Sequence, residues 1–137
     1  MHVASSIMIA LITLVFVVLP AQAQYAEIYR VDKAANGIPE QQAFDNLAAH
    51  LGVSADTLKQ EKTTHNLSFG QLYMAHQLAK TANADLNTIV SEFKSGKAWS
   101  TIAREKNVKI DKIAKDEREV EKLLKKKNST QLQAKTR

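Results

Sequence analysis

The feature that most constrains the fold of this chain is an apolar pattern that occurs three times. In each copy an apolar residue stands beside an alanine, a small or β-branched residue follows the alanine by five positions, and another apolar residue follows five positions later. The copies are Leu47-Ala48, Val53 and Leu58; Leu78-Ala79, Ala84 and Ile89; and Ile102-Ala103, Val108 and Ile113. This spacing is typical of the end of one helix, a tight turn and the start of the next helix. The unequal intervals between the copies predict a loose stack of helical hairpins rather than a regular solenoid.

The residues within these corners suit such a turn. Gly52 in the first copy fits the left-handed position that ends many helices, and Ser54 fits the cap of the following helix. Asn107 in the third copy is expected to take the place of the glycine, because asparagine tolerates a left-handed backbone better than most residues do.

Further signals place the other helices. Ser68 and Gln71 form a capping box, which predicts a helix over 68–81. Asp85 is expected to cap the next helix, and Pro39 suits the first position of a helix upstream.

A final helix is predicted over 110–127. Along this helix Glu121 precedes Lys125 by four positions, which is the favourable order for an ion pair.

The composition supports a helical chain. Four Gly and two Pro in 137 residues leave little room for a turn-rich β-sandwich. The lack of cysteine excludes a disulfide framework, a CxxC redox pair and a thiolate metal site. The expected fold is all-α, a small orthogonal bundle of about five to six helices in stacked helical hairpins with a long basic C-terminal helix.

The first 23 residues have the character of a signal peptide. An apolar run over 7–19 is too short to span a bilayer and is followed by Pro20 and by the small residues of Ala21-Gln22-Ala23. We therefore expect cleavage after Ala23 and export to the periplasm or the medium. Residues 1–6 contain no Lys or Arg, which leaves an uncleaved N-terminal anchor as the alternative. Because no Cys follows the apolar run, a lipoprotein is excluded.

The predicted organisation of the chain has four parts. They are a signal peptide over 1–23, an N-terminal arm over 24–38, a helical domain over 39–127 and a disordered tail over 128–137.

Positive charge is concentrated near the C-terminus. Residues 104–137 hold 12 Lys and Arg and 6 Asp and Glu, a net charge of +6, whereas residues 24–103 hold 7 and 8, a net charge of −1. The candidate binding residues in this region are Lys122, Lys125, Lys126 and Lys127. Such a cluster can attract an anionic lipid or polymer, or it can be the solvated end of a helix whose negative dipole it complements.

One corner has a local resemblance to a known motif. The segment 47–58, LAAHLGVSADTL, resembles the helix-turn-helix corner of bacterial DNA-binding domains, in which alanine is followed four positions later by Gly-Val-Ser. The resemblance covers about a dozen residues. The helix after Ser54 carries Asp56 and Glu61 and no Arg, which argues against sequence-specific DNA binding.

A broader resemblance covers about a third of the chain, 68–113. Its segment 93–103, FKSGKAWSTIA, is similar to that of small exported bacterial helical proteins that have no assigned biochemical activity. Many of those proteins have Gly where this chain has Ala98, and a Gly-Val turn where it has Asn107-Val108. The resemblance implies a helical fold and implies no reaction.

Motifs of catalysis and of cofactor binding are not found in the sequence. There is no G-x-S-x-G elbow, phosphate-cradling glycine loop or H-E-x-x-H motif, so we expect no enzyme activity and no cofactor. His65 and His76 are weak candidates for a metal site, and surface histidines are the simpler interpretation. Trp99 is expected to fill the hairpin core, and the alternative is an exposed platform for a sugar or peptide.

Together these features predict an exported, non-enzymatic binding module of the cell envelope. Its expected partner is an anionic lipid or polymer that meets the Lys-rich C-terminal helix, or a protein. Two alternatives stay open. One is a periplasmic enzyme or metal-handling protein that uses His65 and His76, and the other is an oligomeric structural protein.

Overall fold

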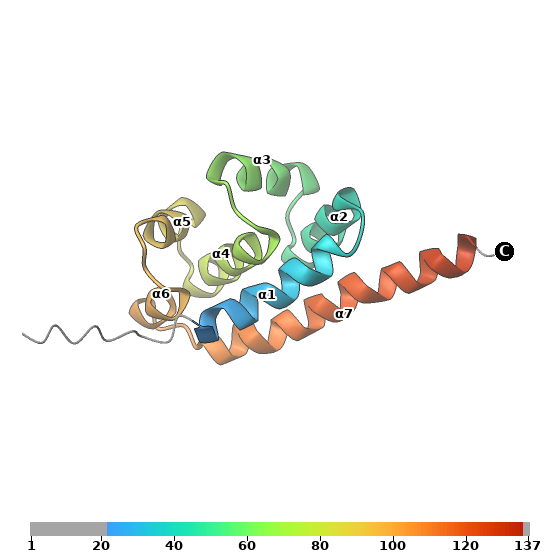
Figure 1. Cartoon of the computed structure of the whole chain (residues 1–137). Coiled ribbons are helices and arrows are strands. Elements are labelled where there is room, and N and C mark those ends of the chain that lie inside the picture. The colour runs from blue at the N-terminus through green and yellow to red at the C-terminus, as the bar shows by residue number, and fades with distance from the viewer. Residues whose placement is uncertain (1–21, 136–137) are drawn as a thin grey trace, which may run out of the picture.

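The computed structural model describes the backbone of residues 22–135 and the side chains of residues 28–125. This part of the chain is all-helical, as the sequence predicts, with seven helices and no strand (Figure 1). The helices are α1 Gln22–Asn36, α2 Glu40–Leu51, α3 Ala55–His65, α4 Phe69–Ala82, α5 Leu86–Lys94, α6 Trp99–Glu105 and α7 Ile110–Lys135. The predicted signal sequence lies outside the described residues, except for Gln22 and Ala23 at the start of α1.

Five connections between the described helices have the same local structure. In each, a residue with positive φ follows the helix, and the N–H of the next residue donates to a carbonyl oxygen five positions earlier. The positive-φ residues are Gly52, Asn66, Asn83, Gly96 and Asn107. The hydrogen bonds are Val53 N to Ala48 O, Leu67 N to Lys62 O, Ala84 N to Ala79 O, Lys97 N to Glu92 O and Val108 N to Ala103 O. The next helix begins three residues after the positive-φ residue each time. The three predicted corners are confirmed, and two further corners share their structure.

Side-chain caps begin three of the helices at the predicted residues. Ser54 and Asp85 each accept a hydrogen bond from the backbone N–H three residues later. Ser68 and Gln71 make both bonds of the capping box. The sequence predicts Pro39 at the first position of the helix, but Pro39 is the N-cap of α2 with an extended backbone, and the helix begins one residue later at Glu40.

The helix α4 occupies the centre of the bundle and contacts each of the other six described helices (Figure 1). Its Leu72, Met74 and Leu78 are buried. The ring of Phe44 on α2 packs against that of Phe69 on α4, with their centroids 4.8 Å apart. None of the described helices is long and apolar enough to cross a membrane.

The segment 24–38, predicted as an N-terminal arm, lies largely in helix α1 and packs against α4 and α7. Val31 and Ala35 are buried at a spacing of four, so they share one face of α1. Asp32 accepts a hydrogen bond of 2.7 Å from the backbone N–H of Gly70, in the first turn of α4. The segment is therefore part of the core, which raises the number of helices above the expected five to six.

The last helix, α7, runs beside α1 and continues past the rest of the bundle (Figure 1). Its buried face is formed by Ile113, Val120 and Leu124, positions that recur with helical periodicity. The helix continues to Lys135, so the backbone of 128–135 is helical where the sequence predicts a disordered tail.

Candidate functional site

The solvent side of α7 carries a row of exposed basic side chains. This basic face consists of Lys112, Lys115, Arg118, Lys122 and Lys125. At 100° per residue these positions span about 140° of the helix, opposite the buried face. Exposed Asp111 and Glu119 lie on the same side of α7, so that side carries five positive charges and two negative ones.

Among the described residues, only one member of the basic face forms an ion pair. Lys125 Nζ lies 2.5 Å from an oxygen of Glu121, one turn earlier on α7. This hydrogen bond from Lys125 holds the pKa of Glu121 below its ordinary value, and Arg30 and Lys33 on α1 act in the same direction. The charges of the other four basic side chains face solvent. Lys126 and Lys127 are also candidate binding residues from the sequence, and their side chains lie outside the described residues.

A cleft of about 670 Å³ opens beside the first turns of α7. Three helices form its walls: the end of α2, the last turns of α4 and the first three turns of α7. Its charged or titratable lining residues are His50, Lys80, Lys112, Lys115, Asp116 and Glu119. We call it the α2/α4/α7 cleft. Lys112 and Lys115 belong both to this cleft and to the basic face, so the two features are continuous.

One carboxylate oxygen, Asp116 Oδ2, links the three helices that form the wall of this cleft. Asp116 Oδ2 lies 2.9 Å from His50 Nε2 on α2 and 3.1 Å from the Tyr73 hydroxyl on α4. It also accepts a hydrogen bond from the side-chain amide of Gln77. Since an ionised carboxylate only accepts hydrogen bonds, three donors from two helices converge on α7 through this one atom.

Tyr73 is the buried member of this cluster. Only 1% of its surface is exposed, and its hydroxyl also lies 3.3 Å from the carbonyl oxygen of Ile113. Burial, reinforced by the negative charge of Asp116, raises the pKa of Tyr73 far above its ordinary value. The phenol therefore stays neutral and acts as a hydrogen-bond donor that holds α7 in place.

Trp99 does not provide an exposed binding surface. Its indole is 2% exposed and stacks on the ring of Phe93, with centroids 4.1 Å apart and planes 9° from parallel. The expectation that Trp99 fills the hairpin core agrees with this burial, and the ring presents almost no exposed face as a platform for a ligand.

His65 and His76 are not brought into a metal-binding cluster. His76 Nε2 lies 2.6 Å from an oxygen of Glu61, and both side chains are largely buried between α3 and α4. His65 is the last residue of α3. No group of three or more His, Cys, Asp or Glu able to hold a metal ion occurs among the described residues.

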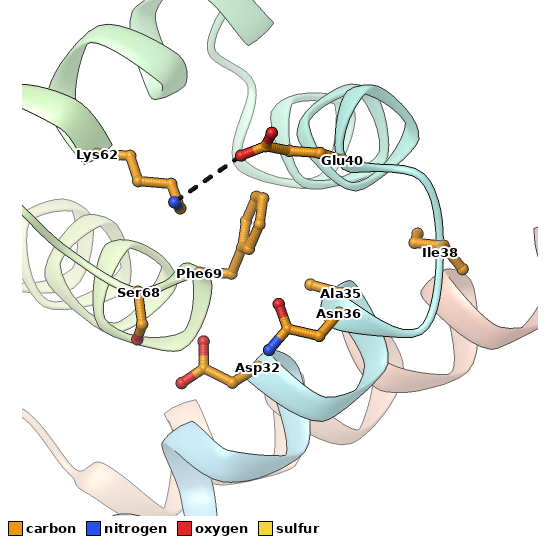
Figure 2. Close-up of a pocket in the computed structure, with 8 residues that line it drawn as sticks. All are labelled: Asp32, Ala35, Asn36, Ile38, Glu40, Lys62, Ser68 and Phe69. Carbon is orange, nitrogen blue, oxygen red and sulfur yellow. Dashed lines mark ion pairs between the residues drawn. The ribbon is translucent and has the colours of Figure 1, made fainter.

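A second hollow, of about 430 Å³, lies where α1, α2, α3 and α4 meet (Figure 2). Lys62 Nζ lies 3.9 Å from a Glu40 oxygen and 5.1 Å from the centre of the Phe69 ring. Asp32, also on this wall, already caps α4. In this hollow Lys62 of α3 therefore pairs with Glu40 of α2, and Asp32 of α1 bonds to the backbone of α4.

Several of the cleft residues were missed by the sequence reasoning. No pattern in the sequence marks Asp116, Gln77 or Lys80 as a functional residue, and His50 is only one of several histidines. The available signal was local: Lys112 and Asp116 are four positions apart, as are Gln77 and Thr81, so each pair shares a helix face. No signal in the sequence indicates that His50 and Asp116, 66 positions apart, would meet.

Comparisons with protein-family models, with curated proteins and with solved structures found nothing that matches this chain.

Proposed function

We propose that this protein is an exported, non-enzymatic binding module of the cell envelope that contacts an anionic partner through α7. The observation that carries the proposal is the basic face of α7, where only Lys125 has an ion-pair partner among the described residues. A row of exposed cations on one rigid helix produces a positive potential that attracts an anionic surface or polymer.

The position of α7 favours this use of the helix. Its apolar side is buried against the bundle through Ile113, Val120 and Leu124, so the basic side is held outward. Each Lys or Arg close to an anionic membrane surface contributes about 1 kcal/mol of attraction. Five such residues, less the two acids on the same side, leave about 3 kcal/mol of attraction for salt-sensitive binding without any pocket.

Export is the second part of the proposal. It rests on the apolar run over 7–19 and on Ala21-Gln22-Ala23, after which we propose that the chain is cleaved. Production in a bacterial host, followed by fractionation and intact-mass analysis, tests this directly. The expected form lacks 23 residues and occurs in the periplasm or medium. A full-length chain in the membrane fraction would instead support the uncleaved anchor.

The test of binding uses the protein as the host processes it. We would measure cosedimentation with vesicles of phosphatidylcholine alone and with added phosphatidylglycerol, at low and at physiological salt. Binding is expected only to the anionic vesicles and should fall steeply with salt, because surface charges are screened over about 8 Å at 0.15 M salt.

Matched charge variants locate the contact surface. Arg118→Gln, Lys122→Gln and Lys125→Gln together remove three charges from the basic face and leave the buried face of α7 intact. The control removes three charges elsewhere, through Lys94→Gln, Lys97→Gln and Arg104→Gln. The first variant should lose most of the vesicle binding and the control should keep it. Equal binding by both, or no binding by the unchanged protein, would refute this function and leave a protein partner as the alternative.

A further inference from the structure

The α2/α4/α7 cleft gathers positive charge from two helices that are distant in the sequence. Lys80 comes from the last turn of α4, while Lys112 and Lys115 come from the first turns of α7. All three side chains are exposed, and none forms an ion pair with a described residue. The cleft is also of the size of a small-ligand site, about 300–1,000 Å³.

The negative charges of the cleft do not cancel these lysines. Asp116 is bound by donors from His50, Tyr73 and Gln77, all on its Oδ2 atom. Glu119 is the other acid in the lining, so three ammonium groups face two carboxylates. The charges of the three lysines, Asp116 and Glu119 sum to +1, and the lysines are the exposed cations of the lining.

The type of cation indicates the type of anion. The fork of an arginine matches carboxylates and phosphates alike, and this cleft holds three separate ammonium groups and no arginine. Lysines act as separate point charges, which suit the several oxygens of a tetrahedral phosphate. The Thr81 hydroxyl in the same lining adds a neutral donor.

We infer that the α2/α4/α7 cleft binds a phosphate group through Lys80, Lys112 and Lys115. The phosphate belongs either to an anionic lipid headgroup or to a free phosphate. This inference rests on the proposed function, since it names the group that an anionic partner would place beside α7. It differs from the proposal in one respect: it requires Lys80, which lies on α4 outside the basic face.

Lys80→Gln is therefore the decisive variant, and Lys94→Gln is its matched control. Both lysines are exposed and stand in the last turn of their helices, α4 and α5, and Lys94 also donates a hydrogen bond of 3.3 Å to the backbone oxygen of Asn66. Circular dichroism and thermal unfolding verify that both variants fold.

The first arm titrates inorganic phosphate into the processed protein and follows backbone amide shifts by NMR, with acetate at equal ionic strength as the reference. Saturable shifts are expected in the last turn of α4 and the first turns of α7. Lys80→Gln should weaken the phosphate affinity about tenfold, the effect of one charge-assisted hydrogen bond, whereas Lys94→Gln should leave it unchanged.

The second arm uses vesicles that contain phosphatidic acid. If Lys80→Gln weakens binding to these vesicles more than Lys94→Gln does, the cleft takes a lipid headgroup. If it weakens only the binding of inorganic phosphate, the cleft takes a free phosphate.

The inference is overturned if Lys80→Gln and Lys94→Gln behave alike in both arms, or if acetate produces the same shifts as phosphate. That failure is distinguishable from failure of the proposed function. Loss of vesicle binding in the Arg118, Lys122 and Lys125 variant, without any effect of Lys80→Gln, would leave the function standing and remove the cleft from it.

Discussion

Among the individual residues, Asp116 links α7 to two other helices. Its Oδ2 atom meets a histidine of α2 and a tyrosine and a glutamine of α4, and its own helix supplies two of the three lysines that line the same cleft. A buried donor that loses its partner is costly, because the partner replaced its contact with water. Asp116 therefore couples the position of α7 to the integrity of the core around Tyr73.

The raised pKa of Tyr73 predicts how stability changes with pH. The unfolded chain releases the phenol proton near the ordinary pKa of about 10, while the folded chain retains it. Unfolding then releases a proton, so the stability that Tyr73 contributes is complete below pH 10 and is lost as the pH rises further. The free energy of unfolding should fall by up to about 1.4 kcal/mol per pH unit above pH 10.

Tyr73→Phe should remove that alkaline loss, because phenylalanine has no proton to release. At neutral pH the same variant should cost about 1 kcal/mol through the lost hydrogen bond. Urea denaturation between pH 7 and pH 11 provides the measurement. Tyr29→Phe is the control, since Tyr29 is 60% exposed. An alkaline slope in Tyr73→Phe as steep as that of the unchanged protein would contradict the assignment.

The elements are joined by five corners that share one backbone structure. Each needs a residue in the left-handed region, which glycine supplies twice and asparagine three times. The fixed three-residue step to the next helix sets the geometry of every hairpin, so these corners determine how α2 to α7 stack. Substitution at a single corner tests this conformational requirement.

Asn83→Ala should destabilise the protein by about 1 kcal/mol, because a Cβ without a compensating polar group is disfavoured at φ 50°. Asn83→Gly should be neutral or stabilising. Asn83 is exposed, so lost packing does not contribute to the change in stability. Thermal unfolding provides the comparison with Asn87→Ala, an exposed asparagine of α5, which should change stability by less than about 0.5 kcal/mol. Equal effects at both positions would argue against conformational strain at the corner.

The contact of α1 with α4 depends on a glycine. A Cβ at Gly70 would lie 2.4 Å from both the Cγ2 atom and the carbonyl oxygen of Ile28. Alanine is favoured over glycine in a helix by about 1 kcal/mol, but a backbone clash of this kind costs more.

Gly70→Ala should therefore destabilise the protein by about 1 to 3 kcal/mol in chemical denaturation. At Gly37 an added Cβ would make only ordinary contacts at 3.5 Å, so Gly37→Ala is the matched control and should be close to neutral. A stabilising Gly70→Ala would mean that α1 does not pack this closely on α4.

At the scale of the whole molecule, α7 is both the support of the proposed binding surface and a part of the core. It contacts α1, α2, α4 and α6, and its apolar side closes the bundle. Removing the basic face by deletion would therefore remove structure as well as charge, which is why point variants are the appropriate tests of binding.

A chain that ends after Asn107 should lose its cooperative unfolding transition. It lacks the buried Ile113, Val120 and Leu124, which together contribute roughly 5 to 9 kcal/mol at about 1.5–3 kcal/mol each. That sum is comparable with the total stability of a small domain. A chain that ends after Lys127 keeps these residues and should unfold cooperatively. Calorimetry distinguishes the two, and a folded shorter chain would show that α7 is dispensable for the core.

The corners and caps could be predicted from the sequence because they are local. A left-handed residue, its hydrogen bond over five positions and the following Ser or Asp cap lie within one short segment, so residue type alone indicates them. The same holds for the basic character of α7 and for the burial of Trp99. The turns at Asn66 and Gly96 were not recognised as corners of the same kind, because the repeated apolar pattern is absent around them.

The sequence determined the all-helical class, the positions of most helix starts and the charge of the last helix, since these depend on neighbours within a few residues. Only the tertiary structure decided that α1 is part of the core, because Val31 and Ala35 gain stability from α4 and α7 rather than from their own segment. It also decided the cleft. His50 and Asp116 are 66 residues apart, and they meet because the packing of α2 and α7 brings their helices together.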